Sequence, residues 1–210
     1  MRVLNLYSGI GGNRKLWEDV KVTAVELNPQ IAAIYQDFFP NDKVIVGDAH
    51  QYLLGHYKEF DFIWSSPPCP THSRVRFWGS HKEDPRVIYP DMSLWQEIIF
   101  FKHYAKCLWV VENVIPYYKP LIVGTKLGKY LFWSNFKIPQ IKTVNVNANR
   151  DLIGKMQETL GINLDGKRLG MRKDKVLRNC VHPETGLHIL NSARNSFPQP
   201  NEGLFEKVSL

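Results

Sequence analysis

Short apolar runs alternate with stretches of helical periodicity through the first half of the chain. The apolar runs predict five strands, at Val3–Tyr7, Lys21–Glu26, Lys43–Val46, Phe60–Trp64 and Cys107–Glu112. The stretches between them predict helices at Asn13–Asp19, Pro29–Phe38 and Ser93–Tyr104. Strands that alternate with helices at this spacing are typical of an α/β fold built on a doubly wound, mainly parallel sheet.

The second half of the chain is less regular. The apolar and aromatic segment Lys129–Phe136 predicts a further strand. Apolar residues within Asp151–Leu160 have helical spacing, and Gly161 predicts a C-terminal cap for that helix. The stretch between residues 141 and 178 is otherwise polar and basic, and the last dozen residues look irregular.

Length and composition bound the possible functions. A chain of 210 residues suits one sizeable α/β domain and hardly two. The net charge of +7 favours a polyanionic partner, although many basic proteins bind none. The three cysteines lie far apart, and the first residues read as a strand, so we expect no metal site, no targeting segment and a reducing, cytoplasmic setting. No apolar run approaches the length that spans a membrane.

A glycine-rich turn, Leu6–Gly12 (LYSGIGG), follows the first predicted strand and opens the first predicted helix. Glycines let the backbone approach a ligand, and a helix N-terminus favours a carboxylate or a phosphate there. Sites for NAD, FAD and S-adenosylmethionine (AdoMet) share such a turn, and an ordinary tight turn is the alternative. Glu26 ends the second strand, where an acid typically holds both hydroxyls of a ribose. Asp48 follows the third strand and is placed to accept an adenine amine, although either acid alone is more typical of a solvated strand end or a helix cap.

Cys69 lies in a polar, proline-rich loop after the fourth strand, Ser66-Pro67-Pro68-Cys69-Pro70. The flanking prolines stiffen the backbone and fix the direction of the sulfur. A histidine and two arginines follow closely and are able to stabilise a thiolate. Cys107, by contrast, is typical of a small buried apolar residue. Glu112 ends the neighbouring fifth strand, so we expect it to face one pocket with Cys69, with a simple strand-end charge as the alternative.

Taken in order, these segments resemble the DNA cytosine-C5 methyltransferase family. The resemblance rests on the glycine turn (Tyr7–Gly12), Glu26, Asp48, Pro68-Cys69, Glu112-Asn113-Val114 and the C-terminal segment Arg178-Asn179-Cys180-Val181-His182-Pro183. Pro-Cys followed by Glu-Asn-Val behind a glycine turn is very specific, and the ordered blocks cover roughly three quarters of the chain.

The resemblance implies a Rossmann-like, AdoMet-dependent methyltransferase fold with two sets of site residues. The cofactor would be held by Tyr7, Gly9, Gly11, Gly12, Glu26, Leu27, Asp48, Ala49, Pro68, Leu94, Asn179 and Val181. The catalytic residues would be Cys69, Glu112, Asn113 and Lys129. The C-terminal segment would place a helix back beside the cofactor site.

The implied reaction transfers a methyl group from AdoMet to C5 of cytosine in DNA. The Cys69 thiolate would add to C6, and Glu112 would hydrogen-bond N3 and the exocyclic amine of the base. The site is expected to lower the cysteine pKa from its usual value of about 8.5. A base inside a duplex cannot be reached from both faces, so base flipping and a double-stranded DNA partner are implied.

The chain departs from the family's pattern at two loops. Pro70-Thr71-His72 stand where a glutamine and, two residues further on, an aromatic residue are common. The segment from Arg76 to Arg86 would form a loop that closes over the base. Gly124–Lys129 lies where a Gln-x-Arg-x-Arg motif is expected. Lys129, with Lys126, would replace its arginines without reproducing a guanidinium fork.

Size is the third departure. We expect a catalytic domain at 1–136, a reduced target-recognition insertion at 137–177 and a C-terminal segment at 178–210 that packs back on the catalytic domain. The insertion is too short for a conventional recognition domain, and a solvated basic loop is its alternative. The residues expected to contact DNA are Ser73, Arg74, Arg76, Lys167, Arg168 and Arg172. Recognition through a homodimer or a partner protein would fit this size, which resembles that of methylases encoded by phages or mobile elements.

Three rival interpretations stay open, and a fourth is set aside. The same chemistry could act on tRNA, because an RNA-methylating branch shares this fold and its Pro-Pro-Cys loop. A modified AdoMet could deliver a larger group, for which an arginine or lysine would have to hold an added carboxylate. A non-catalytic AdoMet-binding or DNA-binding regulator is disfavoured by the intact pair of Cys69 and Glu112. An NAD-dependent oxidoreductase would leave that pair unexplained.

Overall fold

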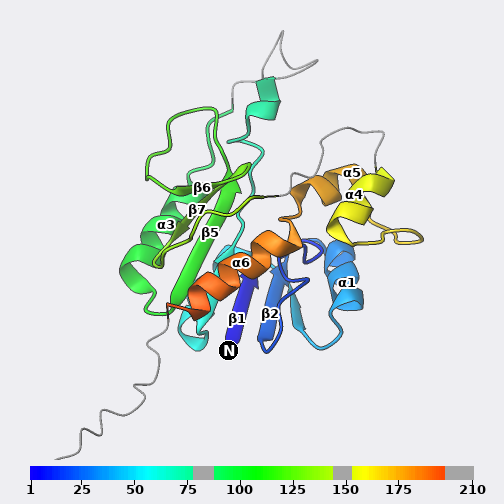
Figure 1. The fold of residues 1–210 in the computed structure, drawn as a ribbon, viewed down its shortest axis with the longest axis horizontal. Helices are drawn as coiled ribbons and strands as arrows, with labels where there is room; N and C mark the ends of the chain where they lie inside the picture. Colours follow the sequence, from blue (N-terminus) through cyan, green and yellow to red (C-terminus); the bar gives the residue numbers. More distant parts are fainter. Residues whose placement is uncertain (78–87, 144–152, 197–210) are drawn as a thin grey trace, which may run out of the picture.

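A seven-stranded sheet forms the centre of the molecule (Figure 1), of which the computed structural model describes residues 1–77, 88–143 and 153–196. The strands lie in the order β3-β2-β1-β4-β5-β7-β6. They are β1 (Arg2–Leu6), β2 (Lys21–Glu26), β3 (Lys43–Val46), β4 (Phe62–Ser65), β5 (Leu108–Val114), β6 (Thr125–Leu127) and β7 (Tyr130–Ser134). The first five pair in parallel, whereas β7 is antiparallel to both β5 and β6. The predicted Rossmann-like, mainly parallel sheet is confirmed.

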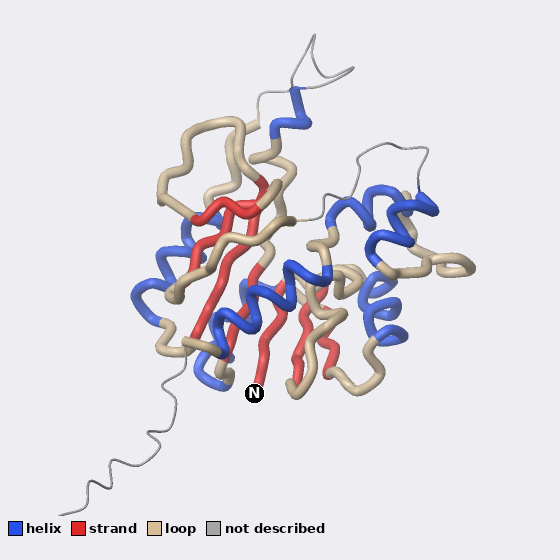
Figure 2. The backbone as a smooth tube through the Cα atoms, viewed as in Figure 1, coloured by secondary structure: helices blue, strands red, loops and turns tan. Residues whose placement is uncertain are grey.

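Helices cover both faces of the sheet, as a doubly wound arrangement requires (Figures 1 and 2). They are α1 (Pro29–Phe38), α2 (Ala49–His56), α3 (Ser93–Tyr104), α4 (Ile153–Leu160), α5 (Lys173–Asn179) and α6 (Pro183–Arg194), with 3-10 turns at Tyr57–Glu59 and Arg74–Phe77. In Figure 1, α6 crosses in front of the sheet and α3 lies behind it. Within the described residues, no helix combines the length and the apolar character needed to cross a membrane.

The core consists of two layers, one on each face of the sheet. Val3 and Phe62 pack in one buried cluster with residues of α6, whereas the next residues along the same strands, Leu4 and Ile63, pack with α2 and α3. Successive side chains of a strand point to opposite faces. Strands that are buried on both faces therefore read as continuous apolar runs, which is how the sequence revealed them.

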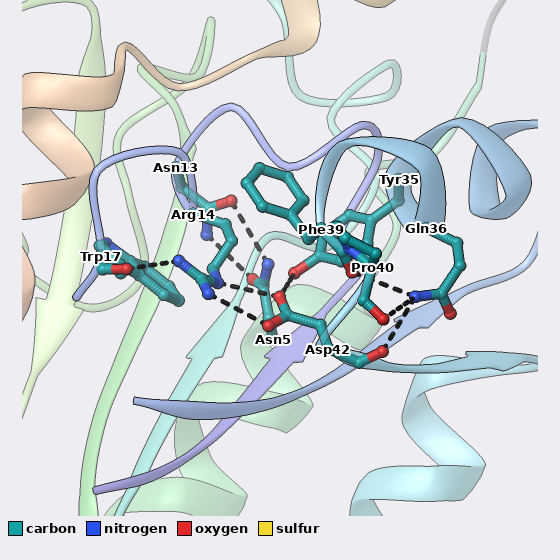
Figure 3. Close-up of polar contacts among 9 residues, drawn as sticks. All are labelled: Asn5, Asn13, Arg14, Trp17, Tyr35, Gln36, Phe39, Pro40 and Asp42. Carbon is teal, nitrogen blue, oxygen red and sulfur yellow. Dashed lines mark hydrogen bonds and ion pairs between the residues drawn. The ribbon is translucent and has the colours of Figure 1, made fainter. Parts of the chain in front are cut away.

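The helix predicted at Asn13–Asp19 is wrong. The chain makes consecutive turns there, and long-range side-chain bonds hold them (Figure 3). Asn13 exchanges hydrogen bonds with Asn5 of β1, and Arg14 forms an ion pair of 2.9 Å with Asp42. These buried polar contacts fix each side chain separately and outweigh the segment's local helical preference. The glycine turn therefore opens no helix, and it gains no helix dipole for binding an anion.

The other predicted helices and strands are confirmed, with described ends that shift by no more than two residues. The sequence did not predict α2, α5 or β6. Helix α2 buries only Ala49 and Leu53, so it carries little apolar periodicity. Strand β6 is too short to show an alternation.

The part of the 137–177 insertion that forms α4 and the start of α5 packs on α1. Met156, Leu160 and Leu177 share a buried cluster with Ile31 and Ile34 of α1. Helices α4 and α5 thus extend the core of the sheet domain. The division of the chain into a catalytic domain, an insertion and a C-terminal segment remains a prediction.

Candidate active site

A cavity of about 280 Å³ lies at the carboxyl ends of the parallel strands. Open parallel sheets bind their ligands at this edge. Its walls come from the glycine turn after β1, the end of β2, the Pro-Cys loop after β4, the end of β5, the start of β7 and the α5–α6 junction. The predicted site residues in its lining are Tyr7, Gly9, Gly12, Glu26, Pro68, Cys69, Glu112, Asn113, Lys129, Asn179 and Val181.

The glycines of the turn serve different purposes. Gly9 lines the cavity with φ +53°, and no atom lies within 4 Å of the place where a Cβ would stand. At Gly11, with φ +80°, a Cβ would come within 2.3 Å of the Phe39 ring. At Gly12, a Cβ would lie 2.7 Å from the Cβ of Cys180. Gly11 therefore allows packing behind the turn, whereas Gly12 lets the α5–α6 junction close one side of the cavity.

Glu26 holds the glycine turn from the end of β2. One of its carboxylate oxygens accepts the N–H of Gly9 at 3.0 Å, and the other accepts the N–H of Asn28 at 2.9 Å. Each carboxylate oxygen has a further lone pair, so Glu26 can still accept hydroxyl groups of a ligand. The neighbouring hydroxyl of Ser8 is buried in the cavity wall, and no described residue forms a hydrogen bond with it. Leaving such a group unpaired costs about 1–3 kcal/mol, which a polar ligand would recover.

Five residues predicted at the cofactor lie outside the cavity lining: Gly11, Leu27, Asp48, Ala49 and Leu94. Asp48 caps α2, because its Oδ1 accepts the N–H of Gln51 at 2.8 Å. The Leu27 side chain is 70% exposed, whereas Ala49 and Leu94 are buried in the core cluster of α2 and α3. Cofactor contacts at these five positions remain predictions.

The end of β5 brings a carboxyl group and an amide to the Pro-Cys loop. The Glu112 carboxyl is buried, and the neighbouring Ser66 hydroxyl acts to lower its pKa. Asn113 donates from Nδ2 to the Pro67 carbonyl at 2.9 Å, and its Oδ1 accepts the N–H of Val114 at 2.9 Å. The nitrogen and the oxygen of the Asn113 side chain thus both form hydrogen bonds within the chain. Asn113 therefore fixes the loop that carries Cys69.

Burial sets the protonation of the reactive groups. It raises the pKa of Glu112 to about 7, although Ser66 and the charge of Lys129 act in the opposite direction. Burial, followed by the negative charge of Glu112, raises the pKa of Cys69 to about 11. The predicted lowering of the cysteine pKa is therefore wrong, because the nearby lysine charges do not offset burial. At neutral pH, Cys69 is a thiol and Glu112 is close to half protonated.

Lys129 supplies a partly buried cation to the same wall. Its Nζ donates to the carbonyl of Arg178 at 3.3 Å and lies 5.0 Å from the ring centre of Tyr130. Burial lowers the pKa of Lys129, and the charge of Glu112 opposes that shift. The lysine thus places one positive charge, without an arginine fork, near the Glu112 carboxyl.

The loop after Cys69 is fastened to the segment that follows β5. The N–H of His72 donates to the carbonyl of Cys69 at 3.0 Å, and its Nδ1 lies 2.6 Å from the Tyr118 hydroxyl. Ser73 pairs with Pro116 in an isolated antiparallel bridge. His72 is fully buried, so at this departure from the family pattern it shapes the loop.

Four of the five cationic residues expected to contact DNA make bonds within the chain. Arg74 donates to the Pro116 carbonyl, and Arg76 donates to the carbonyls of Thr71 and Ile88. Lys167 pairs with Asp37 at 2.6 Å, and Arg172 pairs with Asp174 at 2.8 Å. Contacts of these residues, Ser73 and Arg168 with DNA remain predictions. The loop expected to close over the base lies outside the described residues from position 78 onward.

Sequence reasoning missed Ser8, Ser66 and Tyr130, which all line the cavity. Ser8 and Ser66 stand at the ends of β1 and β4, next to residues that were predicted, so their positions were a usable signal. Tyr130 read only as a strand residue. Its hydroxyl donates to the carbonyl of Cys180 at 2.9 Å, a contact between distant segments that no local pattern reveals.

Comparisons with known proteins identify one family. The family described as C-5 cytosine-specific DNA methylase matches residues 1–114. A comparison with curated protein sequences finds no match.

Solved structures give weaker likenesses. A hypothetical protein of Thermus thermophilus is 14% identical with a TM-score of 0.44, over 63% of this chain and 73% of that one. A mutant of DNMT2 from Spodoptera frugiperda is 26% identical with a TM-score of 0.39, over 54% of this chain and 35% of that one. A conserved hypothetical protein of Streptococcus pyogenes is 15% identical with a TM-score of 0.42, over 64% of this chain and 85% of that one. The chain thus spans about a third of the DNMT2 protein, and all three scores lie too low to carry an argument.

Proposed function

The chain belongs to the C-5 cytosine-specific DNA methylase family, and from this premise we propose that it methylates C5 of cytosine in DNA through a covalent bond between Cys69 and C6 of the base. Its cofactor is AdoMet. One observation carries the proposal: Cys69 and Glu112 line the same cavity as the glycine turn and Glu26. A thiol nucleophile and a buried acid thus stand beside a nucleoside-binding edge.

The cavity wall fits AdoMet in its donor and acceptor groups. The buried Ser8 hydroxyl is without a partner in the described part of the chain, the Gly9 backbone is uncovered, and Glu26 retains free lone pairs. These groups suit the polar parts of a nucleoside amino acid. When bound, AdoMet supplies an electrophilic methyl group and a sulfonium charge that favours a nearby thiolate.

Cys69 provides the nucleophile that makes C5 reactive. The Cys69 thiol first gives its proton to solvent. Its thiolate then forms a bond to C6 while the proton of Glu112 moves to N3, so the electrons of the C5–C6 double bond become available at C5. C5 takes up the methyl group of AdoMet, which leaves S-adenosylhomocysteine. C5 then loses its proton to water, the C6–S bond breaks to restore the double bond and return the thiolate, and N3 returns its proton to Glu112.

Glu112, Lys129 and Asn113 support this sequence of bonds in different ways. With a pKa of about 7, Glu112 retains enough of its protonated form at neutral pH to donate to N3. The Lys129 charge stabilises anionic groups in the same wall, as a single point charge. Asn113 holds the Pro-Cys loop against β5 and thereby sets the position of the sulfur.

Access to the sulfur requires the cytosine to leave its helix. Cys69 lies in the wall of a cavity, so a stacked base cannot approach it. We propose that a duplex delivers the base by flipping, at a cost of a few kcal/mol. The 137–177 insertion is proposed to serve as a reduced recognition element.

The test supplies tritium-methyl AdoMet to the protein with duplex DNA of mixed sequence and, in parallel, with tRNA, followed by separation of the nucleosides. Label in 5-methyldeoxycytidine that disappears in Cys69→Ala supports the proposal. Cys107→Ala is the matched control, because Cys107 lies before β5 and outside the cavity lining. Label confined to tRNA would move the substrate to RNA, and no label on either nucleic acid would contradict the proposed reaction.

A further inference from the structure

Glu97 of α3 is a fully buried carboxyl group for which the proposed chemistry has no use. It lies outside the cavity lining, in the layer between α3 and the sheet. The Tyr7 hydroxyl donates to its Oε1, the Ser65 hydroxyl donates to its Oε2 at 2.7 Å, and Nδ1 of His50 lies 3.4 Å from its Oε1. The loop after β1, the end of β4 and α2 thus all meet at one carboxyl group.

Tyr7 is the residue at which β1 becomes the glycine turn. It lines the cavity and has φ +54°, in the left-handed region that residues with a side chain rarely adopt. Such a conformation persists where the surrounding structure holds it in place. The backbone on its far side is tied to β2, because the N–H of Ser8 donates to the Val25 carbonyl at 3.0 Å. The side chain of Tyr7 is held in turn by the hydrogen bond from its hydroxyl to Glu97.

The same carboxyl group is linked to the catalytic end of β4. Ser65 and Ser66 are consecutive, so their side chains point to opposite faces of the sheet. The Ser65 hydroxyl donates to Glu97, whereas the Ser66 hydroxyl accepts the Nε1–H of Trp64 and lowers the pKa of Glu112. Glu97 is therefore held on the face of the sheet opposite Glu112, and its direct link to the cavity wall runs through Tyr7.

We propose that Glu97 is a positioning residue, whose bond to the Tyr7 hydroxyl holds the glycine turn in the shape that binds the cofactor. Glu97 acts through Tyr7 and touches neither cofactor nor base. Burial raises the pKa of both groups, in keeping with a hydrogen bond that solvent does not weaken. The inference rests on the cofactor site of the proposed function and is independent of the nucleic acid.

The test measures the Kd for S-adenosylhomocysteine by titration calorimetry. Tyr7→Phe removes the hydroxyl and keeps the ring, and Glu97→Gln removes the charge at nearly constant volume. We expect each to raise the Kd about tenfold, since the lost bond involves a charged group. Because both changes break one contact, the double variant should bind no more weakly than the weaker single variant. In turnover, the KM for AdoMet should rise while kcat stays within about twofold.

Tyr35→Phe is the matched control. The Tyr35 hydroxyl is buried and likewise donates to a carboxyl group, that of Asp42 at 2.9 Å (Figure 3), outside the cavity lining. We expect this variant to lower the Tm and to leave the Kd unchanged. The proposal would be overturned if Tyr7→Phe lowered the Tm and left the Kd unchanged. This result decides the question even if Glu97→Gln fails to fold. Normal ligand binding with no transfer to DNA or RNA would contradict the proposed function alone.

Discussion

Two charged regions border the cavity. One buries its charged groups, whereas the other keeps them near the surface in ion pairs. The catalytic wall, formed by Cys69, Glu112 and Lys129, keeps its titratable groups buried, and burial shifts the pKa of all three. The basic stretch at 167–178 keeps its cations near the surface and pairs them with acids of the same chain, as at Lys167–Asp37 and Lys173–Asp165.

The difference shows which charges carry information about function. Holding ionisable groups in a buried wall costs stability, so such a wall marks a site of chemistry. A surface ion pair contributes little, and it cancels charge that a polyanion would otherwise meet. The net charge of +7 therefore does not by itself locate a nucleic-acid surface.

The largest expected effect belongs to the nucleophile of the catalytic wall. Cys69→Ser places a hydroxyl, a far weaker nucleophile, where the sulfur stands. We expect methyl transfer to fall by roughly 10⁴-fold or more, with the Kd for S-adenosylhomocysteine little changed. Single-turnover assays and calorimetry check the two halves of this prediction. Transfer within tenfold of the wild type would remove Cys69 from the chemistry.

The pH dependence of kcat/KM sharpens the role assigned to Glu112. Its protonated form is lost above a pKa of about 7, whereas the Cys69 thiolate grows until about 11. The product of the two fractions rises to about pH 7 and then levels. The amide introduced by Glu112→Gln donates a hydrogen bond at every pH, so the kcat/KM of this variant should keep rising above pH 7. At pH 7 its kcat/KM should be about 10²–10³-fold lower than that of the wild type. A break near pH 7 that survives in this variant would assign it to another group.

Stability should respond to the same carboxyl group. Its pKa is about 7 in the folded protein against an ordinary 4.5, so the unfolded chain releases the proton first. Its contribution to stability is complete below about pH 4.5 and is lost as the pH rises to 7. Relative to the wild type, Glu112→Gln should gain on the order of 3 kcal/mol of folding stability between pH 4.5 and 8. Urea unfolding at both pH values measures this, and a difference that does not vary with pH would contradict the burial described.

The smallest effect tests the basic stretch. Asp37→Asn frees Lys167 from its ion pair, and Asp61→Asn makes the same change of charge near the amino end of β1, where Asp61 pairs with Arg2 at 3.1 Å. If the stretch contacts DNA, Asp37→Asn should raise the affinity about twofold at low salt, with a steeper salt dependence. Fluorescence anisotropy measures the affinity of both variants for DNA. Equal changes in affinity would show that the basic stretch does not contact DNA.

The sequence revealed those features that depend on neighbours along the chain. Buried strands appear as apolar runs, and the segments that carry Cys69 and Glu112 follow two adjacent strand ends, so their meeting was predictable. The helix at Asn13–Asp19 failed because Asn5 and Asp42, distant in sequence, decide that conformation. The pKa of Cys69 depends on the burial of its surroundings, which no spacing reports. Glu97 read only as one polar residue of a helix, because its partners come from three other elements.

The covalent bond between Cys69 and cytosine is the central claim, and a trapped complex tests it most directly. In duplex DNA that carries 5-fluorocytosine, C5 has no proton to lose after methyl transfer, so the C6–S bond cannot be released. With AdoMet present, we predict a complex that survives denaturation, and a proteolytic peptide in which mass spectrometry finds the base on Cys69. A complex attached to another residue, or methylation of ordinary DNA by a protein that forms no such complex, would contradict the account.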